Sequence, residues 1–179
     1  MNLPNKITIF RVCMIPIFLI FMLVSNIPGG KYIAAAVFII AALSDLLDGY
    51  IARKHNLVTN FGKFMDPLAD KLLVSSALIC LVELKLLPAW IVIVIIAREF
   101  IISGFRLIAS DNGVVIAASW WGKIKTVVQM VMSIMLIINL DFDFINVLEQ
   151  IAVYLAAVLT IISLIDYMIK NKNVLKETH

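Results

Sequence analysis

The sequence predicts an all-α, polytopic membrane protein with six transmembrane helices. Hydrophobic residues make up 63% of the 179 positions, and the mean hydropathy is +1.04, whereas apolar residues are roughly half of a soluble domain. The apolar residues also form separate runs of about 20, the length that crosses a bilayer. A soluble core of this size could not bury so much apolar surface. The length favours a single transmembrane domain over residues 1–179.

Six apolar runs define the expected spans. They cover residues 7–25, 32–53, 63–84, 88–109, 122–140 and 147–169. The first run has Lys6 and Arg11 at its start, as a signal peptide would. It is long, however, contains Pro16 and is followed by no small-residue cleavage site, so we expect a retained helix. Cys13 and Cys80 both fall inside spans and give neither a disulfide framework nor metal-ligand spacing.

The positive charges predict the orientation. Of the 15 Lys and Arg, only Lys31 and Lys85 fall on the side opposite the termini, and the loop at 141–146 is acidic. Lys and Arg concentrate in cytoplasmic loops, so both termini are expected in the cytoplasm, with the chain multi-pass in the inner membrane. We see no internal repeat, and the two halves differ sharply in charge, which argues against the repeats common in transporters.

Four aspartates in the second and third spans carry the strongest functional signal. Asp45 and Asp48 are three residues apart, and Asp66 and Asp70 are four apart, so each pair shares a helix face. A carboxylate near a helix centre in the bilayer costs at least ~2.5–3.5 kcal/mol. Counting from the ends of the two spans, all four lie within roughly 12 Å of the cytoplasmic boundary. Four carboxylates close together would repel one another unless cations lay among them. Clustered oxygen ligands favour Mg²⁺ or Mn²⁺ as those cations.

Two alternatives remain for this region. The acids could instead form buried ion pairs with the nearby bases Arg53, Lys63 and Lys71, although those bases lie nearer the interface. Gly49 and Gly62 could let a ligand approach the backbone, or they could simply allow close helix packing.

The spacing D-x2-D-G-x2-A-R-x8-G-x3-D-x3-D resembles the signature of the CDP-alcohol phosphotransferase family. Outer motifs, at residues 2–11, 97–106 and 122–129, are similar to its bacterial phosphatidylglycerophosphate synthase branch. The resemblance therefore covers nearly the whole chain, and it implies the family's six-helix fold, usually homodimeric. The eight fixed signature positions are all matched, by Asp45, Asp48, Gly49, Ala52, Arg53, Gly62, Asp66 and Asp70.

The resemblance also implies a reaction. An alcohol attacks the β-phosphorus of CDP-diacylglycerol and expels CMP, with two divalent ions, Mg²⁺ or Mn²⁺, clamping the diphosphate. By motif match the metal ligands are Asp45, Asp48, Asp66 and Asp70, and Asp70 is also the catalytic base. The residues expected to bind CDP-diacylglycerol are Asn5, Thr8, Arg11, Asp48, Gly49, Ala52, Arg53 and Gly62. Arg11 could instead be an interfacial anchor.

The acceptor implied is sn-glycerol 3-phosphate, whose phosphate needs cationic partners. Arg98 is expected deep in the fourth span, where a guanidinium needs a ligand or a carboxylate. Glu99 is expected not to be that carboxylate, because adjacent helical residues do not face each other. Arg106, Lys123 and Lys125 are expected nearer the surface, as further acceptor-binding residues or as interfacial anchors.

Rival functions remain open. Within the family, the acceptor could be inositol phosphate, serine or phosphatidylglycerol. A divalent cation transporter would also place acids in the membrane, but the outer halves of these spans are almost free of polar side chains. We expect lipid and substrate partners, and no nucleic acid.

Overall fold

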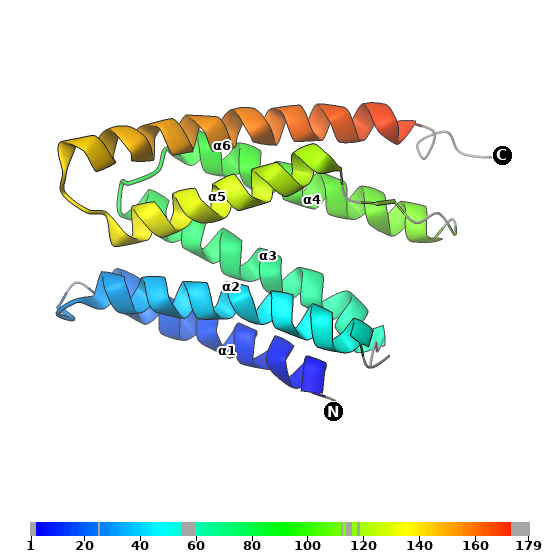
Figure 1. The fold of residues 1–179 in the computed structure, drawn as a ribbon, viewed down its shortest axis with the longest axis horizontal. Coiled ribbons are helices and arrows are strands. Elements are labelled where there is room, and N and C mark those ends of the chain that lie inside the picture. Colours follow the sequence, from blue (N-terminus) through cyan, green and yellow to red (C-terminus); the bar gives the residue numbers. More distant parts are fainter. Residues whose placement is uncertain are drawn as a thin grey trace. The chain divides into compact units, whose positions relative to one another are not determined.

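The computed structural model describes residues 3–24, 26–54, 60–111, 113, 116–117 and 119–172, with the side chains of 3–4, 46–61, 63–64 and 111 excepted. Over these residues the protein is all-helical and contains no strand, so the predicted fold class is confirmed. Six helices follow one another in this part of the chain (Figure 1). They are α1 (Leu3–Leu23), α2 (Gly30–Lys54), α3 (Asn60–Glu83), α4 (Ala89–Asp111), α5 (Trp120–Ile138) and α6 (Asp143–Lys170).

Three of the six helices are long and apolar enough to cross a membrane, judged over the described residues. They are α1 from Asn5 to Leu23, α5 and α6. In α3 and α4 the described residues include a group of charges that lowers their hydropathy: Asp66, Asp70 and Lys71 in α3, and Arg98, Glu99 and Arg106 in α4. Every predicted span coincides with a helix, whereas the count of six membrane crossings stays a prediction.

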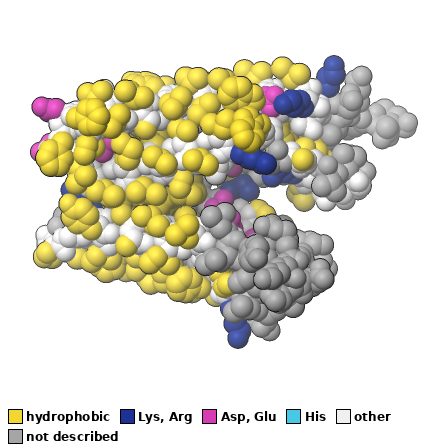
Figure 2. Space-filling view, in the orientation of Figure 1, with side chains coloured by type: hydrophobic (Ala, Val, Ile, Leu, Met, Phe, Trp, Pro, Cys, Tyr) yellow, Lys and Arg dark blue, Asp and Glu magenta, His cyan; other side chains and the backbone are white. Residues whose placement is uncertain are grey.

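The outer surfaces of the helices are those of a membrane protein. Large aliphatic side chains stand far out of the fold, with Ile93 65%, Val127 64% and Ile169 65% exposed. Figure 2 shows hydrophobic side chains over most of the visible helix flanks. Continuous exposed apolar surface of this kind is not stable in water. Lipid is the solvent that matches it, and the chain is a membrane protein.

The helices group into two compact units. The first unit, residues 1–86 with 136–139, contains α1, α2 and α3, and α1 packs against both of the others. The rings of Phe18 and Phe38 meet between α1 and α2, with centroids 5.9 Å apart. Figure 1 shows the start of α1, the end of α2 and the start of α3 together at one end of this unit. That end carries the signature aspartates.

Two turns in the first unit explain why its helices stop where they do. A Cβ on Gly30 would lie 2.8 Å from the backbone oxygen of Phe21, so only glycine permits the close approach of α2 to the end of α1. Lys85 has φ 60°, and its N–H and that of Leu86 donate to the carbonyls of Val82 and Leu81. This is the Schellman arrangement, which satisfies the last carbonyls of a helix.

The second unit, residues 87–135 and 140–179, contains α4, most of α5 and α6. Ile102 and Phe105 of α4 pack on Tyr167 of α6, and the two rings meet edge to face at 6.2 Å. Within this unit the end of α4, the start of α5 and the end of α6 lie at the same end (Figure 1). This arrangement brings polar residues from all three helices together.

Candidate functional site

One face of α1 is polar and completely covered. Asn5, Thr8 and Arg11 recur every three residues, and they are only 8%, 1% and 0% exposed. Their spacing places them on one side of the helix. A buried arginine in a membrane helix requires partners, and those partners come from α2.

Arg11 is bonded to three groups of α2. Its Nη1 lies 2.8 Å from Oδ1 of Asp45, and its Nε donates to the backbone oxygen of Ala41 and to Oγ of Ser44, both at 3.3 Å. Ser44 in turn donates to the Ala41 oxygen at 2.7 Å. Charge-assisted bonds of this kind are stronger than neutral ones. They fix the direction in which the Asp45 carboxylate points.

Thr8 plays the corresponding part for α3. Its hydroxyl donates a short hydrogen bond to Oδ1 of Asp66. Asp45 and Asp66 therefore each give Oδ1 to α1, and neither of these contacts uses Oδ2. The two carboxylates belong to different helices, and residues one turn apart on α1 hold them both.

The remaining signature positions are described only in part. Gly62 is buried and Asp70 is half-buried in α3. The side chains of Asp48, Gly49, Ala52 and Arg53 lie outside the described residues, although their backbone is helical. Among the side chains that are described, no three His, Cys, Asp or Glu gather into a group able to hold a metal ion. The four-carboxylate metal site therefore stays a prediction.

A second polar cluster lies in the other unit, around Arg98. Its Nε donates to Oγ of Ser163 in α6 at 3.1 Å, and its Nη1 lies 3.0 Å from Oε1 of Glu99. Nζ of Lys125 in α5 is bonded to the same glutamate oxygen. Three helices thus meet through one network of ion pairs and hydrogen bonds.

This network corrects two predictions about Glu99 and Lys125. Glu99 was expected not to pair with Arg98, and that expectation is wrong. The side chains of adjacent helical residues leave the helix in different directions, but those of Arg98 and Glu99 are long enough to turn toward each other, and Glu99 also reaches Lys125. Lys125 was expected near the surface, and it is 1% exposed. Arg106 and Lys123 are exposed, as predicted.

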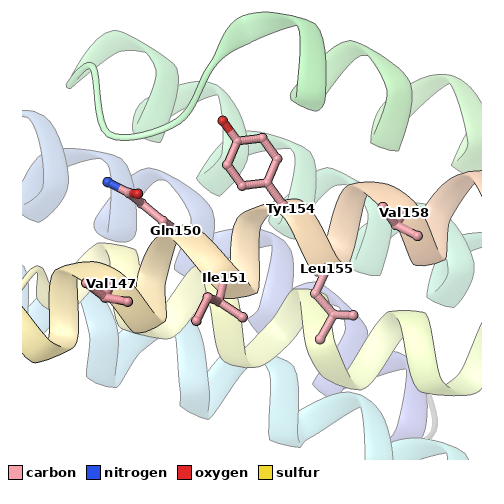
Figure 3. A pocket seen from close by; sticks show the side chains of 6 residues that line it. All are labelled: Val147, Gln150, Ile151, Tyr154, Leu155 and Val158. Atoms are coloured by element: carbon pink, nitrogen blue, oxygen red, sulfur yellow. The ribbon is translucent and has the colours of Figure 1, made fainter.

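Two hollows lie away from both clusters. One, of about 620 Å³, lies between α1 and α3 at the end opposite the aspartates, among residues such as Leu23 and Glu83. The other, of about 460 Å³, follows a single face of α6 (Figure 3). Only Gln150 and Tyr154 bring polar atoms to that face, and Figure 3 shows both side chains standing on one helix. Neither hollow has the charges that a diphosphate needs.

Sequence reasoning missed the residues that orient the charged ones. Ser44 and Ser163 were not selected because single serines in apolar helices usually bond to their own backbone. Gly122 was noted only as part of a motif, yet a Cβ there would lie 3.0 Å from Nη2 of Arg98. The available signal for Ser44 was its position one residue before Asp45, and for Gly122 it was a glycine inside a helical pattern.

The fold and the two clusters define the class of this protein. It is an α-helical membrane protein that keeps carboxylates and cations in the polar interiors of its helix groups. It belongs to the CDP-alcohol phosphatidyltransferase family, which matches it over residues 1–162.

Curated relatives agree with this assignment along nearly their whole length. The chain is 48% identical to a CDP-diacylglycerol–glycerol-3-phosphate 3-phosphatidyltransferase of Bacillus subtilis, covering 99% of each chain. It is 41% identical to the enzyme of that name from Haemophilus influenzae, over 93% of this chain and 91% of the relative. The Rickettsia bellii enzyme of that name is 37% identical over 93% of both chains. The protein is accordingly a phosphatidyltransferase-family enzyme, and the predicted family is confirmed.

Proposed function

We propose that this chain transfers the phosphatidyl group of CDP-diacylglycerol to sn-glycerol 3-phosphate, giving phosphatidylglycerophosphate and CMP in anionic phospholipid biosynthesis. The observation that carries the proposal is the 48% identity, over 99% of both chains, to a relative named for this reaction. All eight fixed positions of the family signature support it, since the residues that define the chemistry are retained.

The donor set fits a pair of divalent ions. Asp45 and Asp66 each direct one carboxylate oxygen to α1, and neither of these contacts uses the other oxygen. Carboxylate oxygens suit Mg²⁺ or Mn²⁺. In the proposal the ions are held by Asp45, Asp48, Asp66 and Asp70. When bound, they would neutralise the diphosphate and the CMP leaving group.

The chain's own residues then divide the work. Asp70 accepts the proton of the attacking hydroxyl, because it is the last acid of the signature and lies one turn beyond Asp66. Asn5, Gly49, Ala52, Arg53 and Gly62 form the cytidine diphosphate side of the site. The contacts of Arg11 and Thr8 support a positioning role, in which they orient the carboxylates of Asp45 and Asp66.

The acceptor side is assigned to the second cluster. Arg98 and Lys125 are buried cations. A phosphate that leaves water binds strongly to cations of this kind, because the hydrogen bonds between them are charge-assisted. Arg106 and Lys123 are exposed and would attract the anionic acceptor rather than hold it. The proposal further places both termini and the active site at the cytoplasmic face of the inner membrane, in a homodimer.

The proposal is tested by following CMP release from the purified chain supplied with CDP-diacylglycerol and Mg²⁺. We expect release with sn-glycerol 3-phosphate and little with glycerol, serine, inositol phosphate or phosphatidylglycerol. Faster release with one of the other acceptors would reassign the substrate within the family. Divalent cation transport by liposomes containing the protein, without CMP release, would reject the enzyme.

Arg11→Lys should weaken Mn²⁺ binding by about 10- to 100-fold, the usual effect of losing a group that orients a metal ligand. Lysine keeps the charge but cannot reproduce the separate bonds of the guanidinium to Asp45 and Ser44. The measurement is titration with Mn²⁺ followed by electron paramagnetic resonance, in the absence of substrate.

Thr8→Val is the companion variant, because it removes the hydroxyl that donates to Asp66 and leaves Arg11 in place. A normal Mn²⁺ affinity in Arg11→Lys together with a raised KM for CDP-diacylglycerol would contradict the positioning role. It would indicate that Arg11 binds the nucleotide instead.

A further inference from the structure

We infer that Gly122, Ser163 and Glu99 position the guanidinium of Arg98, so that its Nη2 edge forms the acceptor-phosphate contact at the first turn of α5. The inference rests on the proposed function and deepens its acceptor side. It adds residues whose role is to fix a cation in place, and it explains how the site would distinguish a phosphorylated alcohol from a neutral one.

The three nitrogens of the guanidinium have different surroundings. Nε donates to Ser163 and Nη1 to Glu99. Nη2 has no hydrogen-bond partner within the described residues, and it lies 3.0 Å from where a Cβ of Gly122 would stand. Arg98 is 7% exposed. Nη2 is not one of the fully buried polar atoms that lack a partner, so this edge of the guanidinium is where a ligand oxygen can approach and gain a charge-assisted bond.

The helical backbone of α5 gives no reason for a glycine at position 122. It lies in α5, whose N-terminal turn is capped by the hydroxyl of Ser119, which accepts from the Gly122 N–H at 3.1 Å. Glycine in a helix is disfavoured relative to alanine. Carbon and nitrogen atoms without a bond between them normally stay further apart than 3.0 Å. The missing side chain therefore leaves the space that Nη2 uses.

Glu99 and Ser163 restrain the cation from the other side. Glu99 binds both Arg98 and Lys125 through one oxygen, so the three charged groups carry a net charge of +1. The cations are ordered before the substrate arrives, which lowers the entropic cost of binding it. A phosphate gains a charge-assisted bond at this positive site, and a neutral hydroxyl gains much less. The geometry thus favours a phosphorylated acceptor.

The test compares Gly122→Ala with Gly104→Ala. Both replacements put alanine into a helix, but nothing lies within 4 Å of a Cβ at Gly104. The Cβ at position 122 would lie 3.0 Å from Nη2 of Arg98 and 3.3 Å from Oγ of Ser119, so the guanidinium edge would have to shift by a few tenths of an ångström. We expect Gly122→Ala to raise the KM for glycerol 3-phosphate about 10-fold, the loss of one charge-assisted bond. The KM for CDP-diacylglycerol and the melting temperature should stay unchanged. Gly104→Ala should change none of these values.

Ser163→Ala provides a second route to the same residue. It removes the acceptor of Nε and should raise the acceptor KM in the same direction. Wild-type kinetics in Gly122→Ala, or a raised KM for both substrates, would overturn the positioning role while leaving the proposed function intact. If the wild-type chain does not release CMP with glycerol 3-phosphate, the proposed function fails, and the inference fails with it.

Discussion

Replacing Asp66 with asparagine should abolish CMP release. Asparagine retains an oxygen that can accept from Thr8, so the packing of α1 against α3 is preserved and the charge alone is lost. A carboxylate that holds a divalent ion supports several kcal/mol of transition-state stabilisation. A loss of about 4 kcal/mol lowers the rate about 1000-fold. The measurement is initial CMP release at saturating substrate.

Asp70→Asn is the matched comparison because it lies one turn further along the same helix. As the proposed base, it should lose turnover while binding CDP-diacylglycerol better than Asp66→Asn does. Excess chelator should silence the wild-type enzyme, and Mg²⁺ or Mn²⁺ should restore it. Turnover of Asp66→Asn near the wild-type rate, or full activity in chelator, would contradict the metal site.

Arg98→Gln should produce the largest change in acceptor use. A charge-assisted hydrogen bond contributes about 1.5–3 kcal/mol, which corresponds to a fall of roughly 10- to 150-fold in kcat/KM for glycerol 3-phosphate. Arg106→Gln should have a smaller effect, since Arg106 is exposed and its charge is screened. The kinetics of each substrate are measured separately, with CDP-diacylglycerol expected to be almost unaffected.

Arg98→Lys separates charge from shape. A lysine retains the charge, but it cannot bond at once to Ser163, Glu99 and a phosphate in the plane of a guanidinium. It should recover only part of the lost activity. An unchanged acceptor KM with a raised KM for the CDP-lipid would place Arg98 on the other substrate. Equal activity with unphosphorylated glycerol would reject the phosphate site.

Much of the fold could be predicted from the sequence because the apolar runs end where turn residues begin. The predicted span 63–84 corresponds to α3 (Asn60–Glu83), and the span 88–109 corresponds to α4 (Ala89–Asp111). The number of membrane crossings is harder to derive, since hydropathy falls in α3 and α4, which carry charged residues. The charged residues of these two helices lower the hydropathy by which a membrane-spanning helix is recognised. Hydropathy alone therefore does not decide whether α3 and α4 cross the membrane.

The acidic residues of the candidate site could be predicted from the sequence, but the residues that bond to them could not. Fixed spacing within one helix revealed Asp66 and Asp70. The bond from Arg11 to Asp45 joins residues 34 apart in the sequence, and no local pattern predicts which helices become neighbours. The Glu99 prediction was wrong for the same reason, because Lys125 of α5 draws the carboxylate away from its expected direction.

The burial of Arg11 has a consequence for how the protein is made. Its bonding partners lie 30 to 34 residues further along the chain, so ribosomes adding 5–20 residues per second supply them roughly 2 to 7 s after the arginine itself. An arginine within the apolar part of a lone membrane helix is costly unless it reaches water or head groups. The first helix is apolar enough to enter the bilayer, but its guanidinium must remain with water or lipid head groups until the second helix follows. The α1–α2 hairpin is therefore the smallest piece of the nascent chain in which Arg11 has these partners.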